Sequence, residues 1–234
     1  MPSEPILTTW PESLLSLFYP RLCLACGQNL PSKASSICLS CNHQLPKTDF
    51  HLQADNPFTE RFWGRIPLHA GAACYHFSKS GRTQQLLHHL KYGGKREVGV
   101  EIGKIYGADL LQSPLFRTVA HIVPVPLHPR RKRQRGYNQA AAFAQGLSQA
   151  MKLPWSEALI RTQHTSSQTS KTRMERFANV SQVFALRDES AVQGKLVLLV
   201  DDVMTTGATL EACAHCLLQA EGTSVAMCTI AIAN

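Results

Sequence analysis

The stretch Val197-Leu198-Leu199-Val200-Asp201-Asp202-Val203-Met204-Thr205-Thr206-Gly207-Ala208-Thr209-Leu210 decides the fold of this 234-residue chain. Its first four residues are aliphatic, which predicts a strand buried on both faces, as in a parallel sheet. Two carboxylates follow where the strand would emerge, and a loop of small residues then opens a helix. Because open α/β sheets bind ligands at the carboxyl ends of their strands, the stretch predicts a binding site.

The loop Thr205–Thr209 has the composition of a phosphate site. A turn of small residues before a helix offers backbone N–H groups, hydroxyls and the positive end of a helix dipole to an anion, and Gly207 permits close approach. Asp201 and Asp202 would repel a phosphate, so they must face something else, such as vicinal ribose hydroxyls or Mg²⁺. This describes a site for a ribose 5-phosphate unit. The alternative is an ordinary capped strand–turn–helix.

The composition favours a globular protein that binds anions. Hydrophobic residues make up 44% of the chain and charged residues 17%, so a sizeable core is expected. No apolar run approaches the ~20 residues that span a bilayer, and the N-terminus lacks the basic flank of a signal peptide. We therefore expect a cytoplasmic protein without membrane insertion. The net charge of +8 favours nucleic acid or a multiply phosphorylated ligand without choosing between them.

Four of the eight cysteines form the pattern C-x2-C-x11-C-x2-C, which comprises Cys23, Cys26, Cys38 and Cys41. Two CxxC turns complete a tetrahedron around one ion, and a closed shell of four sulfurs is typical of structural zinc. The alternative is four unpaired core cysteines. The other four are interpreted as core residues, and they are Cys74, Cys213, Cys216 and Cys228.

Periodicity and turn residues predict the remaining elements. We expect helices at 10–20, 83–92, 98–111 and 138–151, and strands at 70–77, 121–126, 155–160 and 224–232. The strand at 121–126 ends in two prolines, where a cis bond is conceivable. Residues 46–66 resemble an irregular linker, which predicts a first domain at 1–66 and a second at 67–234. Residues 161–170 have the character of an active-site lid, and a short helix with Lys171, Arg173 and Arg176 follows.

The cationic run Arg130–Arg135 leaves three interpretations open. Its five positive side chains could contact a pyrophosphate, a nucleic-acid backbone or only solvent. Few of the five can face one small ligand, and Tyr137 is the only aromatic residue close to the run in sequence. Lys91 precedes Gly93 and Gly94, so it belongs either to a phosphate-contacting loop or to a helix C-cap.

Several motifs together carry a family resemblance. They are the four-cysteine N-terminus, Val123-Pro124-Val125-Pro126-Leu127-His128, Arg135-Gly136-Tyr137-Asn138-Gln139, the series Arg161, Gln168, Arg176 and Asn179, and the Asp201–Thr209 loop. In this order they resemble the ComF/GntX family, which includes ComFC-type competence proteins. The central stretch is similar to the phosphoribosyl pyrophosphate (PRPP) signature of type I phosphoribosyltransferases. The resemblance covers nearly the whole chain.

The resemblance implies an α/β fold of the type I phosphoribosyltransferase class, with a mostly parallel sheet flanked by helices and a small N-terminal zinc module. It implies PRPP and Mg²⁺ as ligands, with Asp201 and Asp202 as the catalytic pair that holds the ribose hydroxyls directly or through Mg²⁺. The implied PRPP-binding residues are Asp201, Asp202, Val203, Met204, Thr205, Thr206, Gly207, Ala208 and Thr209. The implied pyrophosphate loop comprises Pro124, Val125 and Pro126, where Val125 would present its backbone. Further candidate anion or nucleic-acid contacts are Lys91, Arg130, Arg131, Arg133, Arg135 and Arg176.

Three functions remain open at this point. The first is a phosphoribosyltransferase that serves natural competence, with an acceptor that the sequence does not reveal. The second is a non-catalytic factor that binds single-stranded DNA and works with competence helicases or DNA-processing proteins. The third is a zinc-stabilised scaffold for protein partners.

Overall fold

The computed structural model describes residues 20–30, 35–162 and 183–233. The predicted helix at 10–20, most of the predicted lid at 161–170, and the short helix with Lys171, Arg173 and Arg176 lie outside these ranges. Every peptide bond described is trans, so the cis bond considered near Pro124 and Pro126 is absent there. None of the described helices is long and apolar enough to cross a membrane.

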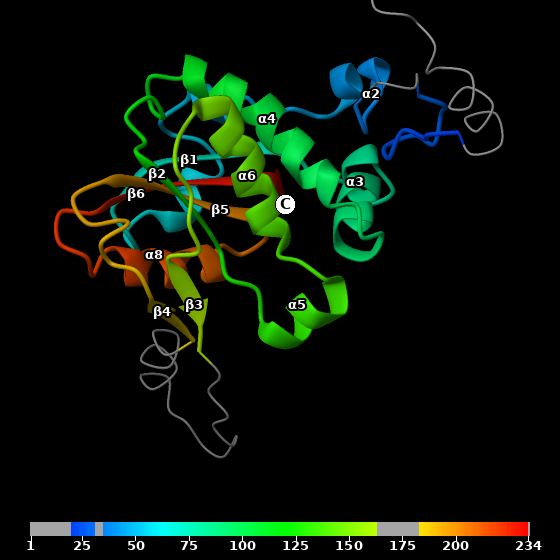
Figure 1. Ribbon diagram of the computed structural model, residues 1–234. Coiled ribbons are helices and arrows are strands. Elements are labelled where there is room, and N and C mark those ends of the chain that lie inside the picture. The colour runs from blue at the N-terminus through cyan, green and yellow to red at the C-terminus, as the bar shows by residue number, and fades with distance from the viewer. Residues whose placement is uncertain (1–19, 31–34, 163–182, 234) are drawn as a thin grey trace, which may run out of the picture.

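A four-stranded parallel sheet forms the centre of the protein (Figure 1). Its order is β1 (Leu68–His76), β6 (Ser224–Ile232), β5 (Leu196–Met204) and β2 (His121–Pro124). Residues 197–200 of β5 are fully buried, because β5 lies between two strands and has helices on both faces. The predicted α/β class and the parallel sheet are confirmed.

Helices cover both faces of the sheet. Helices α4 (Arg96–Gln112) and α6 (Gln139–Met151) lie on one face, and α8 (Ala208–Leu217) lies on the other (Figure 1). Helices α4 and α6 pack unusually closely, because a Cβ placed on Gly146 would lie 2.0 Å from the carbonyl oxygen of Val100. Helix α3 (Arg82–Tyr92) precedes α4, carries Lys91 in its last turn and has Gly93 as its C-cap, while contact of Lys91 with a phosphate stays a prediction.

Strand β5 is longer than the sequence predicts. It continues through both aspartates to Met204, with Asp201 opposite Thr229 and Met204 opposite Ile232 on β6. The aliphatic run ends at Val200, so a prediction from hydrophobicity places the end of the strand at that residue. Pairing with β6 extends it by four residues. Asp201 and Asp202 are therefore fixed by a sheet and do not lie in a free loop.

The cationic run forms a short helix, which hydrophobic periodicity does not predict. Helix α5 (Pro129–Arg135) starts with the His128 side chain accepting the Arg130 N–H, and Pro129 occupies its first turn. Gly136 ends it in the left-handed region at φ 80°. The helix has no buried residue, so it lacks the apolar stripe by which a helix is recognised in a sequence.

A short antiparallel pair stands apart from the main sheet. It consists of β3 (Leu159–Arg161) and β4 (Phe184–Leu186), with Ile160 opposite Ala185. The strand predicted at 155–160 is therefore displaced by a few residues. Trp155 makes only an isolated bridge, to Ile122.

Residues 46–66 are irregular as predicted, but they are packed and do not form a free linker. Two 3-10 turns, η1 (Phe50–Leu52) and η2 (Thr59–Phe62), contact β1. Phe58 and Phe62 are buried in the core. The side-chain amide of Asn56 donates to the carbonyls of residues 50, 53 and 71 and so joins the segment to β1. A division of the chain at residue 66 stays a prediction.

Candidate functional site

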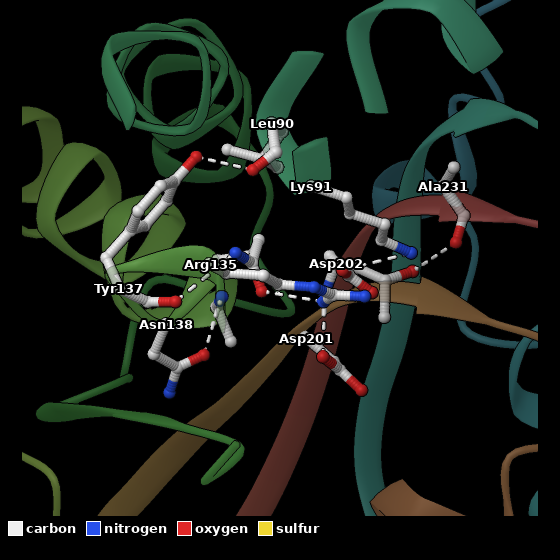
Figure 2. Close-up of polar contacts among 11 residues, drawn as sticks. Leu90, Lys91, Arg135, Tyr137, Asn138, Asp201, Asp202 and Ala231 are labelled. Atoms are coloured by element: carbon white, nitrogen blue, oxygen red, sulfur yellow. Dashed lines mark hydrogen bonds and ion pairs between the residues drawn. The ribbon is translucent and has the colours of Figure 1, made fainter. Parts of the chain in front are cut away.

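Asp201 and Asp202 lie at the carboxyl end of β5, and their side chains point in different directions (Figure 2). Adjacent strand residues face opposite sides of a sheet, so the two carboxylates straddle the strand. The Asp202 Oδ2 lies 3.1 Å from the Lys91 Nζ, which reaches it from the last turn of α3. The Asp201 Oδ1 accepts the Asp202 N–H at 2.8 Å. Both aspartates line the same cavity.

The pKa of Asp201 is strongly raised. Burial is the main cause and the charge of Asp202 adds to it, while the Asp202 N–H and Lys91 act in the opposite direction. The resulting pKa is about 8. Near neutral pH this carboxyl therefore carries a proton that a cation or a change in pH would remove.

Asp201→Asn is expected to stabilise the ligand-free protein at alkaline pH. The folded pKa lies above the usual value of a carboxyl, so wild-type stability falls as the pH rises from about 4 to about 8. Asparagine cannot ionise, yet its side-chain oxygen can still accept the Asp202 N–H. Thermal unfolding from pH 4 to pH 9 should show a gap between the two proteins that grows with pH to roughly 1–3 kcal/mol. A difference in unfolding free energy that does not change with pH would contradict the raised pKa of Asp201.

The loop Thr205–Thr209 is open to solvent, as a phosphate site requires. Thr205, Thr206 and Thr209 are exposed, and residues 201 and 203–210 line a small hollow of about 30 Å³. Gly207 caps α8 with φ 81°, a conformation that residues with a Cβ rarely adopt. The start of α8 therefore presents its free N–H groups beside the aspartates.

A second cavity of about 150 Å³ adjoins the aspartates. Four cations line it together with the two carboxylates, and these cations are Lys91, Arg131, Arg135 and Arg161. They come from α3, α5 and β3, so the sequence gives no local pattern that unites them. A ligand that fits carries several negative charges and also groups that suit carboxylates.

The loop after β2 also lines this cavity, but Val125 cannot present its backbone as expected. The Val125 N–H donates to the Val200 carbonyl at 2.9 Å, and the Val125 carbonyl accepts the Asn138 side-chain amide at 2.9 Å. Both polar groups of its backbone are thus used inside the protein. Pro126 and Leu127, which are half-buried, form the accessible part of this wall.

Only part of the cationic helix faces the cavity. Arg131 and Arg135 line it, whereas Lys132 and Arg133 line a neighbouring groove of about 340 Å³. Arg130 is exposed and lines neither. Two of the five cations therefore line this cavity, and how many of them reach a ligand stays a prediction. Arg176 lies outside the described residues.

The aromatic residue beside the cationic helix is not the one that the sequence indicates. The Tyr137 hydroxyl donates to the Leu90 carbonyl, and the ring is half-buried between α3 and α6 (Figure 2). Tyr92 is instead 66% exposed, and the Arg135 guanidinium lies 5.5 Å from its ring centre. Tyr92 is far from Arg135 in sequence, so only the tertiary structure reveals the pair.

Arg161 is the charged residue of this cavity that sequence reasoning missed. It is quoted above for the family resemblance but not as a ligand, although it stands at the start of the polar run 161–170. In the structure it ends β3, and its guanidinium lies 5.4 Å from the Phe184 ring centre. Arg161 directly follows the strand predicted at 155–160, and this position at a strand end could have marked it as a candidate ligand-binding residue.

The four N-terminal cysteines converge on one point. The sulfurs of Cys23, Cys26, Cys38 and Cys41 all lie within 4.8 Å of one another. The Cys26 and Cys38 sulfurs are 3.9 Å apart, close to the about 3.8 Å expected around a tetrahedral ion with Zn–S bonds of ~2.3 Å. His43 is not part of the cluster. The donor set and its spacing fit a structural zinc ion.

The chemistry of these thiols also suits a cation. Burial disfavours the Cys23 thiolate, but the N–H groups of Cys38, Ala25 and Cys26 outweigh this and lower its pKa to about 7. Burial and the neighbouring sulfurs raise the pKa of Cys41. Such mutual repulsion among thiolates is what a bound metal ion relieves.

The cysteine module is held against α4. The Ser36 N–H donates to Glu101 Oε2 at 2.6 Å, and Arg82 on α3 donates to Gln44 at the end of α2 (Leu39–Gln44). The remaining cysteines, at 74, 213, 216 and 228, are buried in the core, as predicted.

Comparison with known proteins finds a matching family model and similar solved structures. The family model "Phosphoribosyl transferase domain" matches residues 138–234, which include β5, the 205–209 loop and α8. Among solved structures, glutamine PRPP amidotransferase from Bacillus subtilis shares 17% identity and a TM-score of 0.44, over 61% of this chain and 30% of that one.

Curated relatives extend over nearly the whole chain. The DNA utilization protein YhgH of Escherichia coli K12 is 30% identical over 222 residues, which cover 87% of this chain and 93% of the relative. The competence protein ComFC of Bacillus subtilis is 36% identical over 217 residues, which cover 90% and 83%. With its phosphoribosyltransferase domain and its N-terminal four-cysteine cluster, the chain belongs to the ComF family of competence and DNA utilization proteins.

Proposed function

We propose that the protein binds PRPP together with Mg²⁺ and acts as a phosphoribosyltransferase in the uptake or use of DNA. The observation that carries this proposal is one cavity that is lined by two aspartates and four cations and lies beside an open phosphate loop. PRPP has a matching layout, with a 5-phosphate, a ribose diol and a pyrophosphate. The names of the relatives support the DNA context.

The residues divide among the three parts of the ligand. The Thr205–Thr209 loop would bind the 5-phosphate through N–H groups and hydroxyls. Asp202 and Asp201 would accept hydrogen bonds from the ribose hydroxyls. Lys91, Arg131, Arg135 and Arg161 would hold the pyrophosphate and neutralise the charge that develops as it leaves.

Mg²⁺ fits this site because the carboxylates of Asp201 and Asp202 are oxygen ligands of the kind it prefers. When bound, it would supply positive charge to the diol and the pyrophosphate. Lys91 is 24% exposed and Asp202 is 15% exposed in their ion pair, so both side chains are accessible to an incoming ligand. Lys91 would exchange its contact with Asp202 for one with the pyrophosphate.

Isothermal titration calorimetry of the full chain with PRPP tests the proposal. We expect saturable binding that requires Mg²⁺ and is weaker for ribose 5-phosphate, which lacks the pyrophosphate. Proton release should accompany binding near pH 7, because a cation at Asp201 displaces its proton. No heat in any buffer would reject PRPP as the ligand.

A second function, single-stranded DNA binding without catalysis, is favoured by α5. All its cations except Arg135 are exposed, and the exposed ring of Tyr92 adds a surface on which a base can stack. Competence helicases or DNA-processing proteins would be its partners. Filter binding at increasing salt should give a steep negative slope that flattens when Arg130, Arg131 and Arg133 become alanine. A flat curve for the unchanged protein would reject this function.

A further inference from the structure

A segment far away in sequence contacts the phosphate loop, and we call the side of these contacts the outer side because the contacting residues Arg61 and Phe62 do not line the hollow. Arg61, in η2, donates from Nη1 to the Thr205 carbonyl and from Nη2 to the Ala233 carbonyl, the latter at 2.9 Å. Ala233 in turn donates its N–H to the Met204 carbonyl at 2.8 Å. One guanidinium thus joins the start of the loop to the end of β6.

Phe62 packs directly beneath the glycine of the loop. A Cβ placed on Gly207 would lie 2.9 Å from the Phe62 Cζ, so the ring occupies the space that any larger residue would need. Phe62 is buried, with 1% of its surface exposed. Phe62 therefore supports the loop at Gly207 and is not among the residues that line the hollow.

Arg65 extends the same contact to the first turn of α8. Its Nε lies 3.0 Å from Glu211 Oε1, and its Nη2 donates to Glu211 Oε2. Its Nη1 donates to the Arg61 carbonyl at 3.0 Å, which connects the two arginines. The backbone around η2 is itself fixed, because the Asn56 carboxamide oxygen accepts the N–H groups of Phe58 and Thr59.

We propose that Arg61 is a positioning residue for the 5-phosphate, so the inference rests on the proposed function. In a trans peptide the C=O and N–H bonds point in opposite directions. Because Arg61 holds the Thr205 carbonyl, the Thr206 N–H points away from Arg61, and Thr206 is one of the residues that line the hollow whereas Arg61 is not. Arg61 acts through the loop and does not touch the ligand.

The contact also prevents an unfavourable alternative. If the 205–206 peptide flipped, the Thr205 carbonyl would face the phosphate, and its negative end would repel the anion. A cationic donor on the outer side favours the productive orientation, and a charge-assisted hydrogen bond is stronger than a neutral one. Phe62 would support the middle of the loop at Gly207, and the Arg65–Glu211 contact would hold the first turn of α8 that follows it.

The test is calorimetry on the full chain with two probes, Mg²⁺–PRPP and Mg²⁺–pyrophosphate. For Arg61→Ala we expect affinity for PRPP to fall about tenfold, which corresponds to ~1.4 kcal/mol, with affinity for pyrophosphate unchanged. Arg61→Lys should recover part of the loss, because lysine can still donate to a carbonyl. Lys47→Gln is the matched control, since it removes an exposed ion pair with Asp109 on α4.

Equal loss with both probes would mean a general defect of the fold, and no loss with PRPP would mean that the loop needs no external support. Either result overturns the inference. If the unchanged protein does not bind PRPP, the proposed function fails by itself. Amide hydrogen exchange at residues 205–209 then decides the role of Arg61, because Arg61→Ala should accelerate it several-fold without any ligand. Unchanged exchange would overturn the inference independently.

Discussion

Asp202→Asn is expected to lower the affinity for PRPP in the presence of Mg²⁺ by about 30- to 100-fold. The substitution removes a carboxylate that would hold the ribose diol and the metal ion, and hydrogen bonds to charged groups contribute roughly 1.5–3 kcal/mol. Asp202 is partly exposed and paired only with Lys91 among the described residues, so the fold should tolerate asparagine there. Calorimetry with PRPP and Mg²⁺ measures the loss.

The Lys91–Asp202 ion pair supplies a sharp control for this experiment. In Asp202→Asn, Lys91 loses its counter-charge and becomes free to contact an anion. Affinity for pyrophosphate without Mg²⁺ should therefore stay the same or rise. Asp109→Asn, which removes an exposed carboxylate on α4, should change neither affinity. Unchanged PRPP binding in Asp202→Asn would show that the aspartates do not face the sugar.

Cys41→Ser is expected to abolish stoichiometric zinc binding and to lower the thermal unfolding midpoint. Four thiolates close the coordination shell, and structural zinc contributes on the order of 10 kcal/mol of binding free energy in isolated zinc-finger peptides. Without the ion, the repulsion among the clustered sulfurs and the burial of Cys23 and Cys41 are not offset by metal–sulfur bonds, so the folded state is destabilised. Atomic emission spectroscopy and thermal unfolding measure the two effects.

Cys216→Ser provides the matched control. Cys213 and Cys216 also form a CxxC pair, but both are buried in α8, and the Cys216 thiol donates to the Phe184 carbonyl at 3.4 Å. Serine can make the same hydrogen bond, so this variant should retain one zinc ion per chain. Loss of zinc in Cys216→Ser, or full zinc content in Cys41→Ser, would contradict the assignment of the metal to the N-terminal cluster.

The sequence predicts those parts of the site that are local in the chain. The strand, the turn and the helix from Val197 to Leu217 follow one another, so their aliphatic run, glycine and apolar stripe are visible without any tertiary information. The helices at 82–92, 96–112 and 139–151 are found for the same reason. The two CxxC motifs are equally local, and their spacing predicts the cluster.

The remaining parts depend on contacts between distant residues. Lys91, Arg161 and the aspartates meet only because α3, β3 and β5 end at the same side of the molecule. Phe62 and Arg61 lie more than 140 positions before the loop that they support. The hydrophobic pattern of their own segment predicts neither a helix nor a strand there. Helix α5 depends on capping at His128 and Gly136 and has no apolar face. Hydrophobic periodicity cannot detect such features.

A crystal structure with PRPP and Mg²⁺ tests the central claim most directly. We expect the 5-phosphate to lie in the Thr205–Thr209 loop and the pyrophosphate to contact Lys91 and Arg161. The ribose hydroxyls should lie within hydrogen-bond distance of Asp201 or Asp202, or be joined to them by the metal ion. A sugar bound away from both aspartates, or a 5-phosphate seated on α5 with the loop empty, would contradict it.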